Sequence, residues 1–259
     1  MHLIDRYAYS NRIRTVDPAY KAGLAFIVLM LCLLLSEPLV GMMAVGWMFL
    51  LAVRLAGIPV RTFGRVLLAE AAFLVLATVG VVISLSVRDP SGISAWMVRL
   101  GPIWISSSPE AVSQAIILVT RALGAASAMN FLALTTPLID IVELLRRWHV
   151  PLILIDLMTV IYRFIFVLLE TLNRIYIAQD SRLGYHTSYF RAMNSAAMLG
   201  SRLFIDAFQR SQRLQLALES RGYDGGDLRV LPSRYTFDHS LVWLSGAAVV
   251  SLVLAWIIV

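Results

Sequence analysis

Residues 22–53 read AGLAFIVLMLCLLLSEPLVGMMAVGWMFLLAV, and this stretch decides the class of fold. Glu37 is its only charged residue. One unbroken helix over the stretch would be about 48 Å long, whereas the hydrocarbon layer of a bilayer is about 30 Å thick. Because Ser36-Glu37-Pro38 places a charge and a proline in the middle, we predict two membrane-spanning helices joined by a tight turn.

The composition extends this interpretation to the whole chain of 259 residues. Apolar residues make up 59% and charged residues 15%, and the mean hydropathy is +0.78. A soluble domain is nearer 45–50% apolar and about 25% charged. These values exclude an ordinary soluble globule, a disordered chain and a disulfide scaffold, so we predict an all-α, polytopic membrane protein.

Five segments are predicted to cross the membrane. The first follows Asp17-Pro18, where Asp suits the N-cap of a helix and Pro its first position. The predicted spans are residues 22–36, 38–53, 66–87, 111–135 and 240–259. Since a charge within a span is costly, we expect Arg121 to face protein or water, with Glu70 or Glu110 as candidate partners.

Residues 151–170 are also apolar, but they contain Asp156 and Arg163. Residues 171–236 carry nine Lys or Arg and residues 54–65 carry three, and the positive-inside rule places both segments on the cytoplasmic side. If 151–170 crossed the membrane, the nine cations would face outward. We therefore predict five spans with a cytoplasmic N-terminus, and an internal contact between Asp156 and Arg163; six spans is the alternative.

The region after the fourth span has a different character. Thr136-Pro137 starts an amphipathic helix, which Val150-Pro151 ends. The sequence thus predicts a membrane region with four spans over 1–135, a cytoplasmic module over 136–236 and a C-terminal span over 237–259.

Two long helices are predicted in this module, over about 152–182 and 188–221, with Gly184 and Gly222 as their stop signals. In the second helix, small residues recur every four positions, a spacing that lets another helix approach closely. These residues are Ala192, Ala196 and Gly200. We expect the two long helices to cross there, although an incidental run of small residues explains the pattern equally well.

A motif is repeated where the two long helices end. Residues 178–185 read AQDSRLGY and residues 217–223 read ALESRGY, which places Arg182 and Arg221 39 positions apart. A helix C-terminus explains either copy alone, because Arg favours the negative end of the helix dipole and Gly provides the stop. Two copies on consecutive helices favour a second interpretation, in which the arginines dock into acidic grooves on two copies of a partner.

At these residues the chain resembles the transmembrane T subunit of energy-coupling factor (ECF) transporters, the CbiQ/EcfT family. That family carries two Ala-Arg-Gly-type motifs at the ends of two coupling helices. Here Ser replaces Ala in both copies, and Leu183 is an insertion in the first. The segment Asp17-Pro-Ala-Tyr-Lys21 is similar to the family's Asp-Pro-x-x-Lys, and Ile4-Asp-Arg-Tyr-Ala8 looks most like the cobalt-type branch, CbiQ.

The resemblance implies a non-enzymatic coupling subunit of an ABC-type importer in the bacterial cytoplasmic membrane. It implies two ABC-type ATPase subunits that hold ATP and Mg²⁺, and a separate membrane subunit that binds the substrate. Cobalt, for cobalamin biosynthesis, is the substrate it favours, with nickel or a vitamin as alternatives, and this chain is expected to bind no metal or cofactor. The residues that it implies for ATPase coupling are Ser181, Arg182, Gly184, Ser220, Arg221 and Gly222.

Two other classes of membrane protein remain alternatives. A membrane-embedded enzyme needs acids or histidines clustered at one depth, whereas the 16 Asp and Glu residues are scattered along the chain. A secondary carrier often has halves related by a repeat, whereas the repeat here lies in two neighbouring helices. The net charge of +6 does not imply nucleic-acid binding, because basic loops are usual in polytopic proteins.

Overall fold

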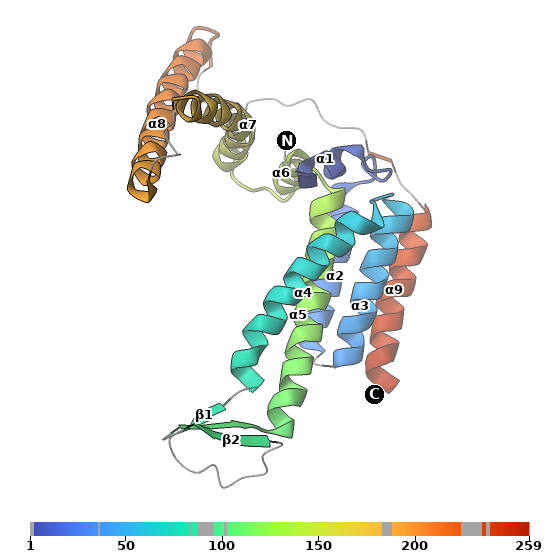
Figure 1. The fold of residues 1–259 in the computed structure, drawn as a ribbon. Helices are drawn as coiled ribbons and strands as arrows, with labels where there is room; N and C mark the ends of the chain where they lie inside the picture. The colour runs from blue at the N-terminus through green and yellow to red at the C-terminus, as the bar shows by residue number, and fades with distance from the viewer. Residues whose placement is uncertain are drawn as a thin grey trace. The chain divides into compact units, whose positions relative to one another are not determined.

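A computed structural model describes residues 3–35, 37–82, 84–86, 96–100, 103–182, 188–223, 235–236 and 239–258. The chain divides into two compact units (Figure 1). Unit 1 comprises Met1–Pro137 with Ser233–Val259, and unit 2 comprises Leu138–Pro232. The described residues form nine α-helices, so the all-α prediction is confirmed, with the addition of one small sheet.

Unit 1 contains most of the helices and all three described strands. Its helices are α1 (Leu3–Ser10), α2 (Pro18–Leu34), α3 (Pro38–Leu50), the π-helix η1 (Leu51–Leu55), α4 (Val60–Val82), α5 (Pro109–Thr135) and α9 (His239–Ile258). Its strands are β1 (Ser84–Ser86), β2 (Trp96–Leu100) and β3 (Ile103–Ser107). The strands pair antiparallel in the order β1-β3-β2, between the end of α4 and the start of α5. Unit 2 contains α6 (Leu138–Arg147), α7 (Leu152–Asp180) and α8 (Tyr189–Glu219).

Among the described residues, five helices are long and apolar enough to cross a membrane, which agrees with the predicted number. They are α3 continued through η1, α4, α5, α7 and α9. The membership differs from the prediction, because α7 meets the criteria of length and composition, whereas α2 has only 17 residues. The third span was also expected to reach residue 87, but α4 ends at Val82 and β1 begins at Ser84.

The start of α2 confirms the predicted helix signal. Pro18 is the first helical residue, and the side chain of Asp17 accepts a hydrogen bond of 2.9 Å from the backbone N–H of Ala19. This bond satisfies one of the N–H groups that have no partner within the helix. At the other predicted start, Thr136 is the C-cap of α5, and α6 begins at Leu138.

The tightest helix contact in unit 1 joins α3 to α5. A Cβ atom placed on Gly41 would lie 2.3 Å from the backbone oxygen of Thr120, and one on Gly124 would lie 3.1 Å from the Cα of Gly41. The two backbones therefore touch at a point where any side chain would separate them. Around this point lies an apolar core that includes Val28, Met48 and Phe131, all fully buried.

The single lysine of the chain, Lys21, is fully buried near the start of α2. Its ammonium donates hydrogen bonds of 3.2 Å to the backbone oxygens of Ile13 and Thr135. Asn11 donates a third bond, of 3.0 Å, to the same oxygen of Thr135. The segment before α2, the start of α2 and the end of α5 are thus held together at one joint, and the motif Asp17-Pro-x-x-Lys21 has a structural role here.

Arg121 is not paired with either of the expected acids. Its guanidinium donates to the backbone oxygen of Leu33, near the end of α2. Glu70 instead accepts a hydrogen bond of 2.7 Å from the side-chain amide of Asn130, which links α4 to α5. Arg121 therefore faces protein, as expected, but its partner is a backbone carbonyl group and not a carboxylate.

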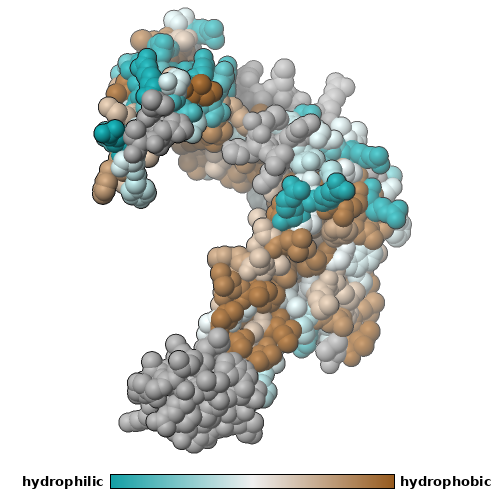
Figure 2. All heavy atoms as spheres, in the orientation of Figure 1, coloured by the Kyte–Doolittle hydropathy of each residue, from teal (hydrophilic) through white to brown (hydrophobic). Residues whose placement is uncertain are grey.

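The outer surface of unit 1 is apolar along its helices, as Figure 2 shows. On α4 the exposed side chains include Leu68, Phe73 and Leu76, each more than 70% exposed, and Phe63 is its one fully buried residue among those described. Exposed apolar surface of this extent is unusual for a soluble protein and is expected where helices face lipid.

The close approach at Gly41 generates a prediction. Gly41→Ala places a methyl group against the backbone of α5, so we expect the chain to lose about 1–3 kcal/mol of stability. Thermal unfolding of the detergent-purified protein measures this loss. Gly46→Ala is the control, because Gly46 lies on the same helix with no atom within 4 Å of its Cβ position. Equal melting temperatures for the two variants would contradict the packing described for α3 and α5.

A second prediction concerns the joint at Lys21. Lys21→Met keeps the apolar stem but removes both hydrogen bonds, and hydrogen bonds from charged donors are worth about 1.5–3 kcal/mol each. We expect a lower melting temperature and faster proteolysis of the segment before α2. Arg14→Met serves as the control, since Arg14 is exposed. Unchanged proteolysis of the Lys21 variant would show that the joint does not hold this segment.

Candidate functional site

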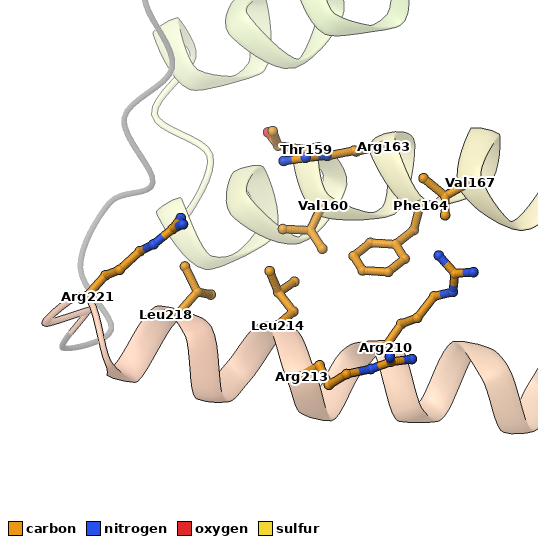
Figure 3. A pocket seen from close by; sticks show the side chains of 10 residues that line it. All are labelled: Thr159, Val160, Arg163, Phe164, Val167, Arg210, Arg213, Leu214, Leu218 and Arg221. Atoms are coloured by element: carbon orange, nitrogen blue, oxygen red, sulfur yellow. The ribbon is translucent and has the colours of Figure 1, made fainter.

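The two long helices of unit 2, α7 and α8, lie side by side and antiparallel where they contact each other (Figure 3). Arg210 on α8 connects them. Its guanidinium donates a 2.9 Å bond to Asp206, one turn away, and a 3.2 Å bond to the hydroxyl of Thr171 on α7. The Thr171 hydroxyl in turn donates its hydrogen to the backbone oxygen of Val167. Its oxygen is therefore oriented to accept the bond from Arg210.

The two helices end in the same way. The hydroxyl of Ser181 donates to the backbone oxygen three residues earlier, Ala178, at 3.1 Å, and Ser220 donates to Ala217 at the same distance. Each serine is the C-cap of its helix. The serines that replace alanine in the repeated motif therefore satisfy backbone oxygens at both helix ends, which would otherwise lack partners within the helix.

The arginine that follows each serine is held by its backbone while its side chain is exposed. The N–H of Arg182 donates to Gln179 at 3.1 Å, and the N–H of Arg221 donates to Leu218 at 3.0 Å. Both side chains are exposed. The structure thus places one exposed guanidinium at the same position on each helix end, as the repeated motif predicts.

Gly222 ends α8 in the manner predicted from the sequence. Its φ is +77°, in the left-handed region that favours glycine. The N–H of Tyr223 donates to Leu218 and that of Gly222 donates to Glu219, both at 3.0 Å, which is the bond pattern of a Schellman motif. The equivalent residue of α7, Gly184, lies outside the described residues.

The stripe of small residues on α8 does not lie in the contact with α7. Ala196 and Gly200 are exposed and Ala192 is half-buried, and no atom lies within 4 Å of the Cβ position of Gly200. The contacts with α7 involve instead the later part of α8, around Arg210 and Leu214. The expectation that the helices cross at the stripe is therefore not met within the described residues. The physical reason is that larger side chains, and not small ones, fill the antiparallel contact.

The joint between α6 and α7 also differs from expectation. Asp156 lies 4.0 Å from the guanidinium of Arg146 on α6, so its ion pair is not with Arg163. Arg163 instead lines a cavity between α7 and α8, together with two arginines of α8 and Arg221 after its end. His149, in the turn after α6, has a φ of +58°, which turns the chain from α6 toward α7. Single-helix periodicity could not find these contacts, because they connect different helices.

Residues 10–231 match the family model described as CbiQ, cobalt transport protein. The chain belongs to the CbiQ family. Its predicted resemblance is thereby confirmed, and the chain is a multi-pass transmembrane component of an ECF/CbiQ-type transporter and not an enzyme.

Three relatives illustrate the range of this family. The chain is 35% identical over 144 residues to the cobalt transport protein CbiQ of Rhodobacter capsulatus. This alignment covers 56% of this chain and 58% of the relative. It is 34% identical over 166 residues to the energy-coupling factor transporter transmembrane protein EcfT of Brevibacillus brevis, covering 60% and 61%. It is 27% identical over 224 residues to the putative fused cobalt transport protein CbiMQ of Methanocorpusculum labreanum, covering 86% and 37%. The match thus spans less than two thirds of each of these relatives.

The helix end at Gly222 generates a third prediction. Gly222→Ala forces a side chain into the left-handed region, so we expect the end of α8 to lose about 1 kcal/mol and to fray. Faster hydrogen exchange at the N–H of Tyr223 reports this fraying. The matched control is Gly200→Ala, because Gly200 lies within the same helix beside open space. If the exchange rate at Tyr223 is the same in both variants, the Schellman bonds do not hold this end.

Proposed function

We propose that this CbiQ-family chain is the coupling subunit of a cobalt importer. In this proposal, α7 and α8 transmit ATP-driven movement from two ABC-type ATPase subunits to a separate membrane subunit that binds the metal. The observation that supports it is the matching geometry of the two helix ends, where Ser181 and Ser220 make the same bond and Arg182 and Arg221 are exposed.

The chemistry of the two arginines fits such a contact. A guanidinium presents a planar fork of donors that holds its charge and binds a carboxylate in two places at once. One fork at the end of each helix suits two equal acidic grooves, as two ATPase subunits would offer. In this proposal Ser181, Gly184, Ser220 and Gly222 shape the helix ends, and the two arginines make the charged contacts.

The distribution of charge supports a cytoplasmic position for these helix ends. Residues 171–236 carry nine Lys or Arg, the largest share of any segment, and the positive-inside rule favours the cytoplasm for them. The same rule favours a cytoplasmic N-terminus, where residues 1–21 carry four. The ATPase subunits, which hold ATP and Mg²⁺, would then reach both arginines.

The metal is proposed to be cargo bound by the partner and not by this chain. Within the described residues, no three His, Cys, Asp or Glu side chains come together as ligands for a metal. The name of the putative fused cobalt transport protein CbiMQ, of which the alignment with this chain covers only 37%, supports a second membrane component. Cobalt is favoured over nickel or a vitamin by the names of the CbiQ relatives.

A fourth prediction tests the two arginines. Arg182→Ala and Arg221→Ala each remove one charged contact, so we expect at least about thirtyfold weaker association with the co-expressed ATPase pair. Cobalt uptake should fall in parallel, in cells that carry the complete importer. Co-purification and uptake of radioactive Co²⁺ measure the two effects.

Matched controls exist on the same helices. Arg174 on α7 pairs with Glu170 at 3.4 Å, and Arg202 on α8 is exposed, so Arg174→Ala and Arg202→Ala should keep ATPase binding. Wild-type binding and uptake in both test variants would refute the proposed contacts. Uptake of Ni²⁺ or a vitamin in place of Co²⁺ would keep the coupling role but overturn the cobalt assignment.

A further inference from the structure

A cavity of about 600 Å³ lies between α7 and α8. Figure 3 labels the side chains that line it, which include four arginines together with apolar residues. The arginines are Arg163 on α7, Arg210 and Arg213 on α8, and Arg221 just after the end of α8. This volume lies within the range of about 300–1,000 Å³ that is usual for ligand sites.

The charges around the cavity are unbalanced. Among the residues that the structure describes, no acidic side chain lines it, and Arg210 alone of the four arginines has an ion pair, with Asp206. The Nε of Arg213 donates to the backbone oxygen of Gln209. Because this oxygen belongs to a neutral group, the bond does not balance the positive charge of Arg213. Four guanidinium groups around one hollow raise its positive potential and favour an occupant with at least one negative charge.

The remaining lining of the cavity is apolar. Val160, Phe164 and Val167 of α7 face Leu214 and Leu218 of α8, as Figure 3 shows. An inorganic anion alone gains nothing from such a lining. An occupant that also carries an apolar part buries these side chains while its charge meets the arginines.

The apolar lining continues onto the surface of α7. Leu157, Ile161 and Ile165 are between 43% and 53% exposed, and α7 is apolar enough to be a candidate membrane span. Such a helix requires a cover of lipid or of another apolar surface. A basic pocket between helices, beside a lipid-compatible face, is the arrangement that binds the head groups of anionic lipids.

We propose that the cavity between α7 and α8 binds an anionic phospholipid, with its phosphate near Arg163, Arg210 and Arg213 and the start of an acyl chain against Phe164 and Leu214. The lipid would occupy the cavity and so fix the distance between the two helices. This inference does not depend on ATPase binding. Because Arg221 also belongs to the proposed ATPase contact, the test leaves that residue unchanged.

The test uses the full chain in lipid nanodiscs. Arg163→Gln and Arg213→Gln are combined, since each arginine near an anionic lipid contributes roughly fivefold to binding. Native mass spectrometry, or a fluorescent phosphatidylglycerol, should show about thirtyfold weaker retention of phosphatidylglycerol in the double variant. Arg202→Gln together with Arg191→Gln is the control, because both residues are exposed on α8 outside the cavity and the net charge changes equally.

Four results would overturn the proposal. Equal loss in the test and control variants would mean that only net charge attracts the lipid. Equal retention of phosphatidylcholine, or binding of inorganic phosphate with the same arginine dependence, would exclude an anionic lipid as the selected ligand. Loss of the ATPase pair from the Arg163/Arg213 variant, with phosphatidylglycerol retention unchanged, would assign the cavity to an acidic segment of a protein partner.

Discussion

The contact between α3 and α5 is the constraint on which unit 1 depends, because α1, α2 and α4 also pack against α5. At Gly41 and Gly124 the two backbones touch with no space for a side chain between them. In a bilayer, helices gain little by hiding apolar surface from lipid, so close packing of small residues must supply much of the association. Because α2 and α4 also pack against α5, their positions depend on the short distance between α3 and α5.

Two cations of unit 1, the buried Lys21 and the half-buried Arg121, hold helix ends in place. Lys21 and Arg121 donate to backbone oxygens at the ends of helices, at Thr135 of α5 and Leu33 of α2 respectively. These oxygens lack partners within their helices and carry the negative end of the helix dipole. Each cation therefore finds an acceptor for its N–H groups, and the unpaired carbonyl gains a donor. Neither cation needs a carboxylate within the membrane as its partner.

Local signals in the sequence were sufficient wherever the structure depends on neighbours along the chain. Asp17-Pro18 predicted the start of α2, Gly222 predicted the end of α8, and apolar runs predicted four of the five candidate spans, all but α7. The sheet β1–β3 was missed, because its strands of three and five residues sit between spans that were found by hydropathy alone. The contacts of Asp156 with Arg146, of Arg121 with Leu33 and of Arg210 with Thr171 were also beyond reach, since each joins different helices and sequence spacing carries no signal for it.

The length of α8 has a consequence for any movement of unit 2. With 31 residues the helix is about 46 Å long, and the hydrogen bond from Arg210 to Thr171 lies nearer to its C-terminal end than to its start. If α8 tilts about this bond as a stiff rod, the two ends sweep unequal arcs in opposite directions. The long arm carries the exposed aromatic side chains of Tyr189 and Phe190, while the short arm carries Arg221. A small displacement at the arginine end is thus converted into a larger one at the aromatic end, by the geometry of a lever.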